Sequence, residues 1–128
     1  SPKLLSSDLS LISDQRIKFA GQITGVEGYV ESASTGLLSG LLMYNKLTVR
    51  EQKPPPKTTA MGSLISYITR KDHVKDFQPM NINFGLFENM DVRDIRKKPK
   101  RIRDMEKKIR IARRAESDLN KWLKSSFV

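Results

Sequence analysis

The chain has 128 residues, the usual size of one domain, with 24 lysines and arginines against 14 aspartates and glutamates and no cysteine. This composition excludes a disulfide-stapled scaffold, a cysteine-ligated zinc site and a cysteine nucleophile in this piece, and a single histidine argues against a histidine metal centre. No apolar run approaches the ~20 residues that span a bilayer, and no targeting signal opens the chain, so we expect a cytoplasmic protein without a membrane partner or a metal.

The excess positive charge is concentrated in the last part of the chain. Residues 1–90 hold 10 basic and 8 acidic side chains, whereas residues 91–128 hold 14 basic and 6 acidic ones. A one-sided excess of this kind indicates a polyanionic partner, a nucleic acid or an anionic membrane surface. We therefore treat residues 91–128 as a separate basic helical tail.

The first elements are a short strand and a long helix. Residues 1–15 show no clear period and predict a loop with short extended pieces. Arg16–Ala20 alternates polar and apolar residues, which predicts a strand that runs into Gly21. From about Val26 to Leu47 apolar residues recur every three or four positions, which predicts a helix with Thr24 as a plausible N-cap. These apolar positions are Val30, Ala33, Leu37, Leu41 and Tyr44.

Three consecutive prolines in QKPPPK (residues 52–57) break this helix, because proline removes a hydrogen-bond donor and fixes an extended chain. Thr58 or Thr59 is expected to cap a second helix that ends at about Thr69. Its buried side chains are expected to be Met61, Leu64, Ile65 and Ile68. The segment Phe77–Phe87 alternates again and predicts an extended chain with one apolar face, too irregular for a regular strand.

Pro99 precedes a long amphipathic helix, predicted from about Lys100 to Lys124. Its narrow apolar stripe consists of Ile102, Met105, Ile109, Ala112, Leu119 and Leu123. The basic residues of this helix are candidate contacts to an RNA backbone, where each phosphate contact adds salt dependence. These candidates are Arg101, Arg103, Lys107, Lys108, Arg110, Arg113 and Arg114. The alternative is a solvated helix face, and a membrane surface is disfavoured by a stripe without large aromatic residues.

A glycine-punctuated turn joins the predicted strand to the first helix. Gly21, Gly25 and Gly28 allow a close approach of the backbone to a ligand, and the N-terminus of the helix offers N–H groups to an anionic group. The alternative is an ordinary tight strand–helix turn, since the spacing is not GxGxxG. Asn81 and Asn83 are interpreted mainly as turn-capping residues, although a role at a nucleotide edge stays open.

Longer motifs add a family resemblance. Phe19–Tyr29 (FAGQITGVEGY), Thr58–Thr69 (TTAMGSLISYIT) and Phe77–Phe87 (FQPMNINFGLF) resemble the glucose-inhibited-division flavoprotein superfamily. Within it they are similar to the folate- and FAD-dependent tRNA (uracil-5-)-methyltransferases. The resemblance covers about residues 1–90 and corresponds to the C-terminal quarter or third of such enzymes.

The resemblance implies an α/β fold in which residues 1–90 form the C-terminal part of a Rossmann-like FAD-binding domain, with a short strand and a long helix. Helical and extended segments and the basic C-terminal helix would follow. It also implies formation of 5-methyluridine in the tRNA T-loop, with FAD as cofactor and methylenetetrahydrofolate and NAD(P)H as co-substrates. Partners would be tRNA and the upstream part of the same polypeptide.

On this resemblance the cofactor-binding residues are expected in the glycine turn: Gly21, Gln22, Thr24, Gly25, Val26, Gly28 and Tyr29. No catalytic residue is expected in this piece, because the cysteines of the family are absent from it, and the piece alone should be inactive. The alternatives are a homologue that modifies ribosomal RNA or wobble uridine, and a non-enzymatic RNA-binding or interaction module.

Overall fold

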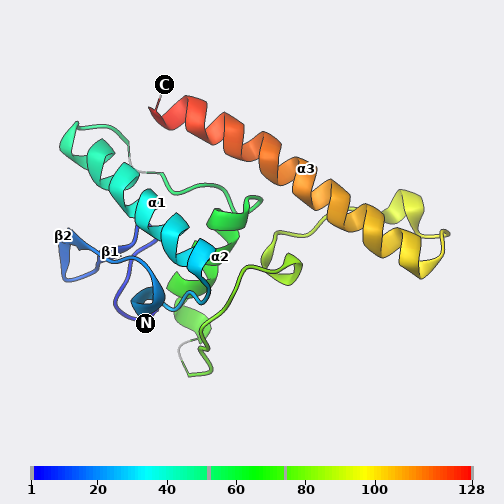
Figure 1. Ribbon diagram of the computed structural model, residues 1–128, viewed down its shortest axis with the longest axis horizontal. Helices are drawn as coiled ribbons and strands as arrows, with labels where there is room; N and C mark the ends of the chain where they lie inside the picture. The colour runs from blue at the N-terminus through cyan, green and yellow to red at the C-terminus, as the bar shows by residue number, and fades with distance from the viewer. Residues whose placement is uncertain (1, 52, 74, 128) are drawn as a thin grey trace.

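The computed structural model describes residues 2–51, 53–73 and 75–127, without the side chain of His73. The fold is mixed α/β, with one two-stranded antiparallel sheet and three α-helices in the described part of the chain (Figure 1). The strands and α-helices are β1 (Ser10–Leu11), β2 (Asp14–Lys18), α1 (Tyr29–Leu47), α2 (Ala60–Thr69) and α3 (Lys100–Phe127). Four 3₁₀ turns, η1 to η4, span Gln22–Thr24, Lys71–His73, Phe84–Leu86 and Arg93–Ile95.

The sheet is a small hairpin that lies before the glycine turn. β2 begins and ends two residues earlier than the predicted strand, and its partner β1 lies in the segment predicted as a loop with short extended pieces. Ser10 pairs with Lys18 and Leu11 with Asp14, with an irregular register between the two pairs. A strand of two residues has no period, so the sequence predicted short extended pieces in this segment without giving the position of β1.

Helix α1 begins at Tyr29, three residues later than predicted, and its N-cap is Gly28. The prediction that Thr24 caps this helix is wrong: Thr24 lies in η1, is fully buried, and donates its hydroxyl to the Gly21 carbonyl at 2.7 Å. The chain can turn into the helix at Gly28 because its φ of 83° is a left-handed value that glycine adopts without strain.

The side chains that revealed α1 in the sequence do not form its buried face. Val30 is 76% exposed and Leu37 is 68% exposed. The buried face instead consists of Thr35, Leu38, Ser39, Leu42 and Asn45. Two of these polar side chains bond to the strand–helix connection, since Ser39 Oγ donates to the Phe19 carbonyl and Thr35 Oγ1 accepts from the Gly21 N–H, both at 2.9 Å.

Helix α2 follows the prediction closely. Thr59 is its N-cap, and the hydroxyl accepts from the Gly62 N–H at 3.0 Å, a bond that stabilises a helix by about 1 kcal/mol. Leu64, Ile65 and Ile68 are buried as expected, whereas Met61 is only partly buried. Local signals in the sequence after the prolines therefore predict α2 and its N-cap correctly.

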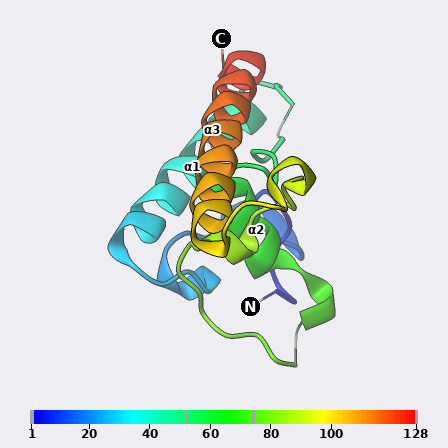
Figure 2. The ribbon, with the colours of Figure 1, turned by 90° about the vertical axis from the view of Figure 1, so that its right-hand side faces the viewer.

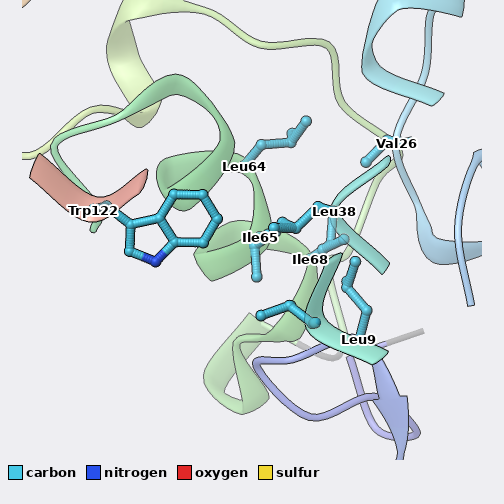
Figure 3. Close-up of a cluster of buried hydrophobic side chains, with 8 residues drawn as sticks. Leu9, Val26, Leu38, Leu64, Ile65, Ile68 and Trp122 are labelled. Carbon is cyan, nitrogen blue, oxygen red and sulfur yellow. The ribbon is translucent and has the colours of Figure 1, made fainter. Parts of the chain in front are cut away.

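The core joins all parts of the chain. Figure 3 shows Trp122 of α3 directed toward Leu64 and Ile65 of α2, with Val26, Leu38, Ile68 and Leu9 beside them. The indole of Trp122 also donates Nε1–H to the Lys53 carbonyl at 2.9 Å, and its ring meets Phe127 edge-on. The end of α3 is thus fixed to the rest of the molecule.

Helix α3 ends three residues later than predicted, and the stripe that revealed it lies outward. Ile102, Met105 and Ile109 are exposed, while the buried side chains of the helix are Ile111 and Trp122. In Figure 1 the first half of α3 extends to the right of the body formed by the hairpin, α1 and α2, and in Figure 2 this half faces the viewer.

Candidate functional site

The glycine turn between β2 and α1 has a backbone that requires glycine. Gly25 has a φ of 102°, and a Cβ added there would overlap the ring of Phe77. Gly28 has a φ of 83°, and a Cβ there would meet the carboxylate of Glu31 and lie 3.1 Å from Asn81 Oδ1. Conformation and space therefore both select glycine at these two positions.

A distant segment holds this turn in place. The Met80 N–H donates to the Gly25 carbonyl and the Glu27 N–H donates to the Met80 carbonyl, both at 3.1 Å, which forms a parallel bridge between Val26 and Met80. In addition, Glu31 accepts from the Ile82 N–H at 3.2 Å. The structure thus joins two of the sequence motifs, residues 19–29 and residues 77–87, into one unit.

The predicted cofactor residues fall into two groups. Thr24, Gly25 and Val26 are buried within the chain, so they shape the turn and present no side chain to a ligand. Gln22 and Tyr29 are exposed, and Tyr29 is 93% exposed. Gly21 and Gly28 are partly exposed and flank the same turn.

Helix α1 begins at this turn. No side chain caps it, because Gly28 occupies the N-cap position, and Glu31 lies in its first turn. The N–H groups of a first turn carry partial positive charge and suit an anionic ring edge or a phosphate. A flavin fits these residues through the backbone beside Gly28 and the exposed side chains of Gln22 and Tyr29.

The predicted turn-capping role of the asparagines is confirmed for Asn83. Its Oδ1 accepts from the Gly85 N–H at 2.9 Å and caps η3, while its Nδ2 donates to the Asn81 carbonyl at 3.2 Å.

The predicted RNA contacts on α3 also fall into two groups. Arg110 forms a fork with both carboxylate oxygens of Asp94, at 2.8 and 2.7 Å, and also contacts Glu106 at 3.2 Å. The Arg110 guanidinium lowers the pKa of Asp94, and Lys98 and Arg110 lower that of Glu106. Arg114 donates to the backbone carbonyls of residues 88 and 89. These two arginines fasten the segment before α3 to the helix.

The other predicted RNA contacts are, except for one, exposed side chains. Arg101, Lys107, Lys108 and Arg113 are exposed, and Arg103 is partly buried. Arg101 and Lys108 are seven residues apart, two helical turns, and therefore lie on one face of α3. This half of the helix presents a cationic surface suited to phosphates.

Two further kinds of site are absent from the described part of the chain. It holds no cluster of three or more histidine, cysteine, aspartate or glutamate side chains that could bind a metal ion. Within the same residues, no helix combines the length and the apolar character needed to cross a membrane.

Comparison with known proteins shows what the chain is similar to. The family model described as glucose inhibited division protein A matches residues 1–51. Proteins named methylenetetrahydrofolate–tRNA-(uracil-5-)-methyltransferase TrmFO match nearly the whole chain. The one from Novosphingobium aromaticivorans is 44% identical over 96% of this chain, and the one from Hyphomonas neptunium is 47% identical over 100% of it.

The chain is similar to a TrmFO protein along nearly its whole length. The similarity to the Myxococcus xanthus TrmFO is of the same order, 46% identity over 96% of this chain. The chain spans about a quarter of the length of these relatives, 25% of the Novosphingobium protein and 26% of the Myxococcus protein. The glycine turn and the basic helix both lie within the matched residues.

The sequence did not reveal one feature of the surface beside α3. Phe84 and Phe87 stack beside α3, with ring centroids 5.9 Å apart and planes at 29°, and Lys108 Nζ lies 5.6 Å from the Phe84 ring. The signal available was the aromatic pair in FGLF, which the alternating pattern of residues 77–87 obscured.

Proposed function

We propose that the protein is an FAD-dependent tRNA methyltransferase that forms 5-methyluridine with methylenetetrahydrofolate as the one-carbon donor. The observation that carries this proposal is the 44–47% identity to TrmFO proteins over nearly the whole chain. Those proteins are named for the donor, for tRNA and for the uracil C5 position. FAD and NAD(P)H are proposed from the flavoprotein resemblance of the glycine turn, and the matching family model supports the FAD.

In this proposal residues 1–90 contribute to a Rossmann-like FAD-binding domain. Gln22, Tyr29 and the backbone at Gly21 and Gly28 would hold the flavin, while Thr24, Gly25 and Val26 keep the turn in shape. When bound, the flavin supplies the reduction that turns the methylene unit into a methyl group, with electrons from NAD(P)H. The N–H groups at the start of α1 would stabilise negative charge on the ring edge.

Residues 91–128 would bind the RNA. Arg101, Lys107, Lys108 and Arg113 are exposed and would contact phosphates, and Arg103 would contribute where its guanidinium reaches the surface. Arg110 and Arg114 act in support, because their contacts within the chain fix the segment beside α3.

Further parts of the same polypeptide would cover the outward face of α1. Val30 and Leu37 are mostly exposed on it, and a Cβ added at Gly36 or Gly40 would meet no atom within 4 Å. Such a face suits close packing against another element. Relatives about four times as long as this chain have the residues to supply that element.

The experiment is an activity assay of the intact protein with a tRNA transcript, labelled methylenetetrahydrofolate and NAD(P)H. We expect label at C5 of a T-loop uridine, and a flavin absorbance spectrum in the purified protein. Parallel assays use ribosomal RNA and a tRNA whose only modifiable uridine is at the wobble position. Label in either of these alone supports the corresponding homologue, and a colourless protein that binds RNA without transfer supports a binding module.

A further inference from the structure

An open cavity of about 590 Å³ lies between the extended segment after α2 and helix α3. Ile82, Phe84 and Phe87 line it from the segment, and Ala112 and Ala115 line it from the helix. Its volume falls in the range of small-molecule sites in proteins. The small alanine side chains of α3 leave the space that larger residues at these positions would fill.

The chemistry of this cavity suits a flat unsaturated ring. Phe84 is 44% exposed, with Phe87 stacked on its ring and the Lys108 ammonium over the ring, so a base that stacks there takes the place of the ammonium. Ile82 and the two alanines supply apolar contacts around it. Stacking on an exposed phenylalanine accepts every nucleobase, because each base has a π-face.

The surroundings of the cavity favour an anionic partner. Lys108 Nζ lies 5.6 Å from the Phe84 ring, and Arg101 lies on the same face of α3. Asn83 also lines the cavity, and its carboxamide has more hydrogen-bonding capacity than its bonds to Gly85 and Asn81 use. A stacking ring, a polar amide and cations together match a nucleotide, whereas an apolar peptide would need neither the amide nor the cations.

We propose that this cavity binds an unstacked base of the RNA substrate, with the base on Phe84 in place of the Lys108 ammonium and Lys108 turned to a neighbouring phosphate. The inference rests on the proposed function, since it assumes that RNA is the substrate. It adds a base-binding site to a surface that would otherwise hold only the backbone. Unpaired loop bases are the bases available for such stacking in a folded RNA.

The test measures binding of the intact protein to two 12-nucleotide RNAs, oligouridylate and an abasic RNA with the same backbone. Phe84→Ala should weaken oligouridylate binding by roughly 5- to 150-fold. It should leave abasic binding unchanged. Phe84→Trp should restore or strengthen oligouridylate binding, because tryptophan presents a larger ring. Lys108→Gln should weaken both RNAs by a similar factor, since it removes a charge from the backbone contact.

The outcomes separate this inference from the proposed function. If the wild-type protein binds oligouridylate and Phe84→Ala binds it equally well, the base site is wrong and the RNA substrate stands. If Phe84→Ala weakens the binding of both RNAs equally and Phe84→Trp does not restore it, the base site is also wrong and the substitution has damaged the surface. If the wild-type protein binds neither these RNAs nor tRNA, the proposed function fails and this inference with it.

Discussion

At the scale of single residues, the exposed side chains of the glycine turn are the ones that could contact a cofactor, whereas the buried ones support the turn. Tyr29 and Tyr44 are both exposed tyrosines on α1, but only Tyr29 lies at the turn, while Tyr44 lies about four turns further along the helix and faces Arg50. A comparison of the two therefore tests the position and not the residue type.

We expect Tyr29→Ala to weaken FAD binding by the intact protein several-fold and to shift the flavin reduction potential. Tyr44→Ala should change neither quantity, because it lies far from the N-terminus of α1. Flavin release on dilution and spectroelectrochemical titration measure the two effects. If both variants had the same FAD affinity and the same reduction potential, Tyr29 and the turn would not be part of the flavin site.

Another residue-scale feature is a nearly buried ion pair under the hairpin. Lys18 is 5% exposed, and its ammonium donates to Asp8 Oδ2 at 2.7 Å and to Ser10 Oγ at 2.9 Å. Partial burial would raise the pKa of Asp8, but hydrogen bonds from Lys18, Ser6 and Ser10 outweigh it and hold that pKa well below its usual range. Ionised Asp8 therefore stabilises the fold.

Asp8→Asn should lower the free energy of unfolding by about 1.5–3 kcal/mol at pH 7, because it removes the charge that balances Lys18. A depressed folded pKa contributes stability above the ordinary aspartate value of 3.8 and loses it as pH falls further. Denaturant unfolding at pH 7 and pH 3 should show the gap between variant and wild type narrowing at pH 3. The matched control is Asp14→Asn, at an exposed pair with Arg16, and we expect it to have a much smaller effect.

At the scale of elements, local signals predicted more than non-local ones. The N-cap at Thr59, the break at the prolines and the span of α1 each depend on a few neighbouring residues. The bridge from Val26 to Met80 joins segments more than 50 residues apart and has no periodic signature, so the sequence did not reveal that it holds the glycine turn. The sequence motifs indicated where the candidate site lies. The structure was needed to show that Thr24, one of its predicted residues, is buried.

The arginines of α3 show the same limit. Their spacing marked a basic face, but it did not indicate that Arg110 pairs with Asp94 or that Arg114 bonds to backbone carbonyls. These partners lie on the irregular segment before the helix, where no pattern fixes their position. The number of cations available to RNA is therefore smaller than the number counted in the sequence.

Removal of two exposed cations should reduce the salt dependence of RNA binding. For Lys107→Gln with Arg113→Gln, we expect the slope of log K against log salt to fall by about 1.5, because two phosphate contacts are lost. The control removes two exposed cations from the first part of the chain, Lys57→Gln with Lys75→Gln, and should leave the slope unchanged. Titrations of tRNA at several salt concentrations measure both. Identical slopes in the two double variants would mean that α3 is a solvated face.

At the scale of the whole molecule, the two long helices turn apolar residues outward. Leu37 and Leu41 of α1 and Leu119 and Leu123 of α3 line one apolar groove, next to Trp122. A continuous surface of this kind across two helices agrees with the proposal that the rest of the polypeptide packs here. The glycines of α1 provide a direct test.

In an open helix, Gly36→Ala should stabilise the protein by about 1 kcal/mol through helix propensity. We expect the opposite in the intact protein, a lower melting temperature, because a methyl group added under a packed element costs about 1–3 kcal/mol. Asn120→Ala on an exposed position of α3 is the control and should raise the melting temperature slightly. Stabilisation by Gly36→Ala of the size that propensity predicts would show that the face is uncovered.

The attachment of α3 by its end has a mechanical consequence. Trp122 and the last turns of the helix are fixed to the core, and Arg101 lies 21 residues away, about 32 Å along the axis. The helix is also held near its middle, because Ile111 is buried and Arg110 pairs with Asp94. The cationic first turns therefore move together with the segment that carries Asp94. The position of Arg101 thus depends on that ion pair as well as on the core around Trp122.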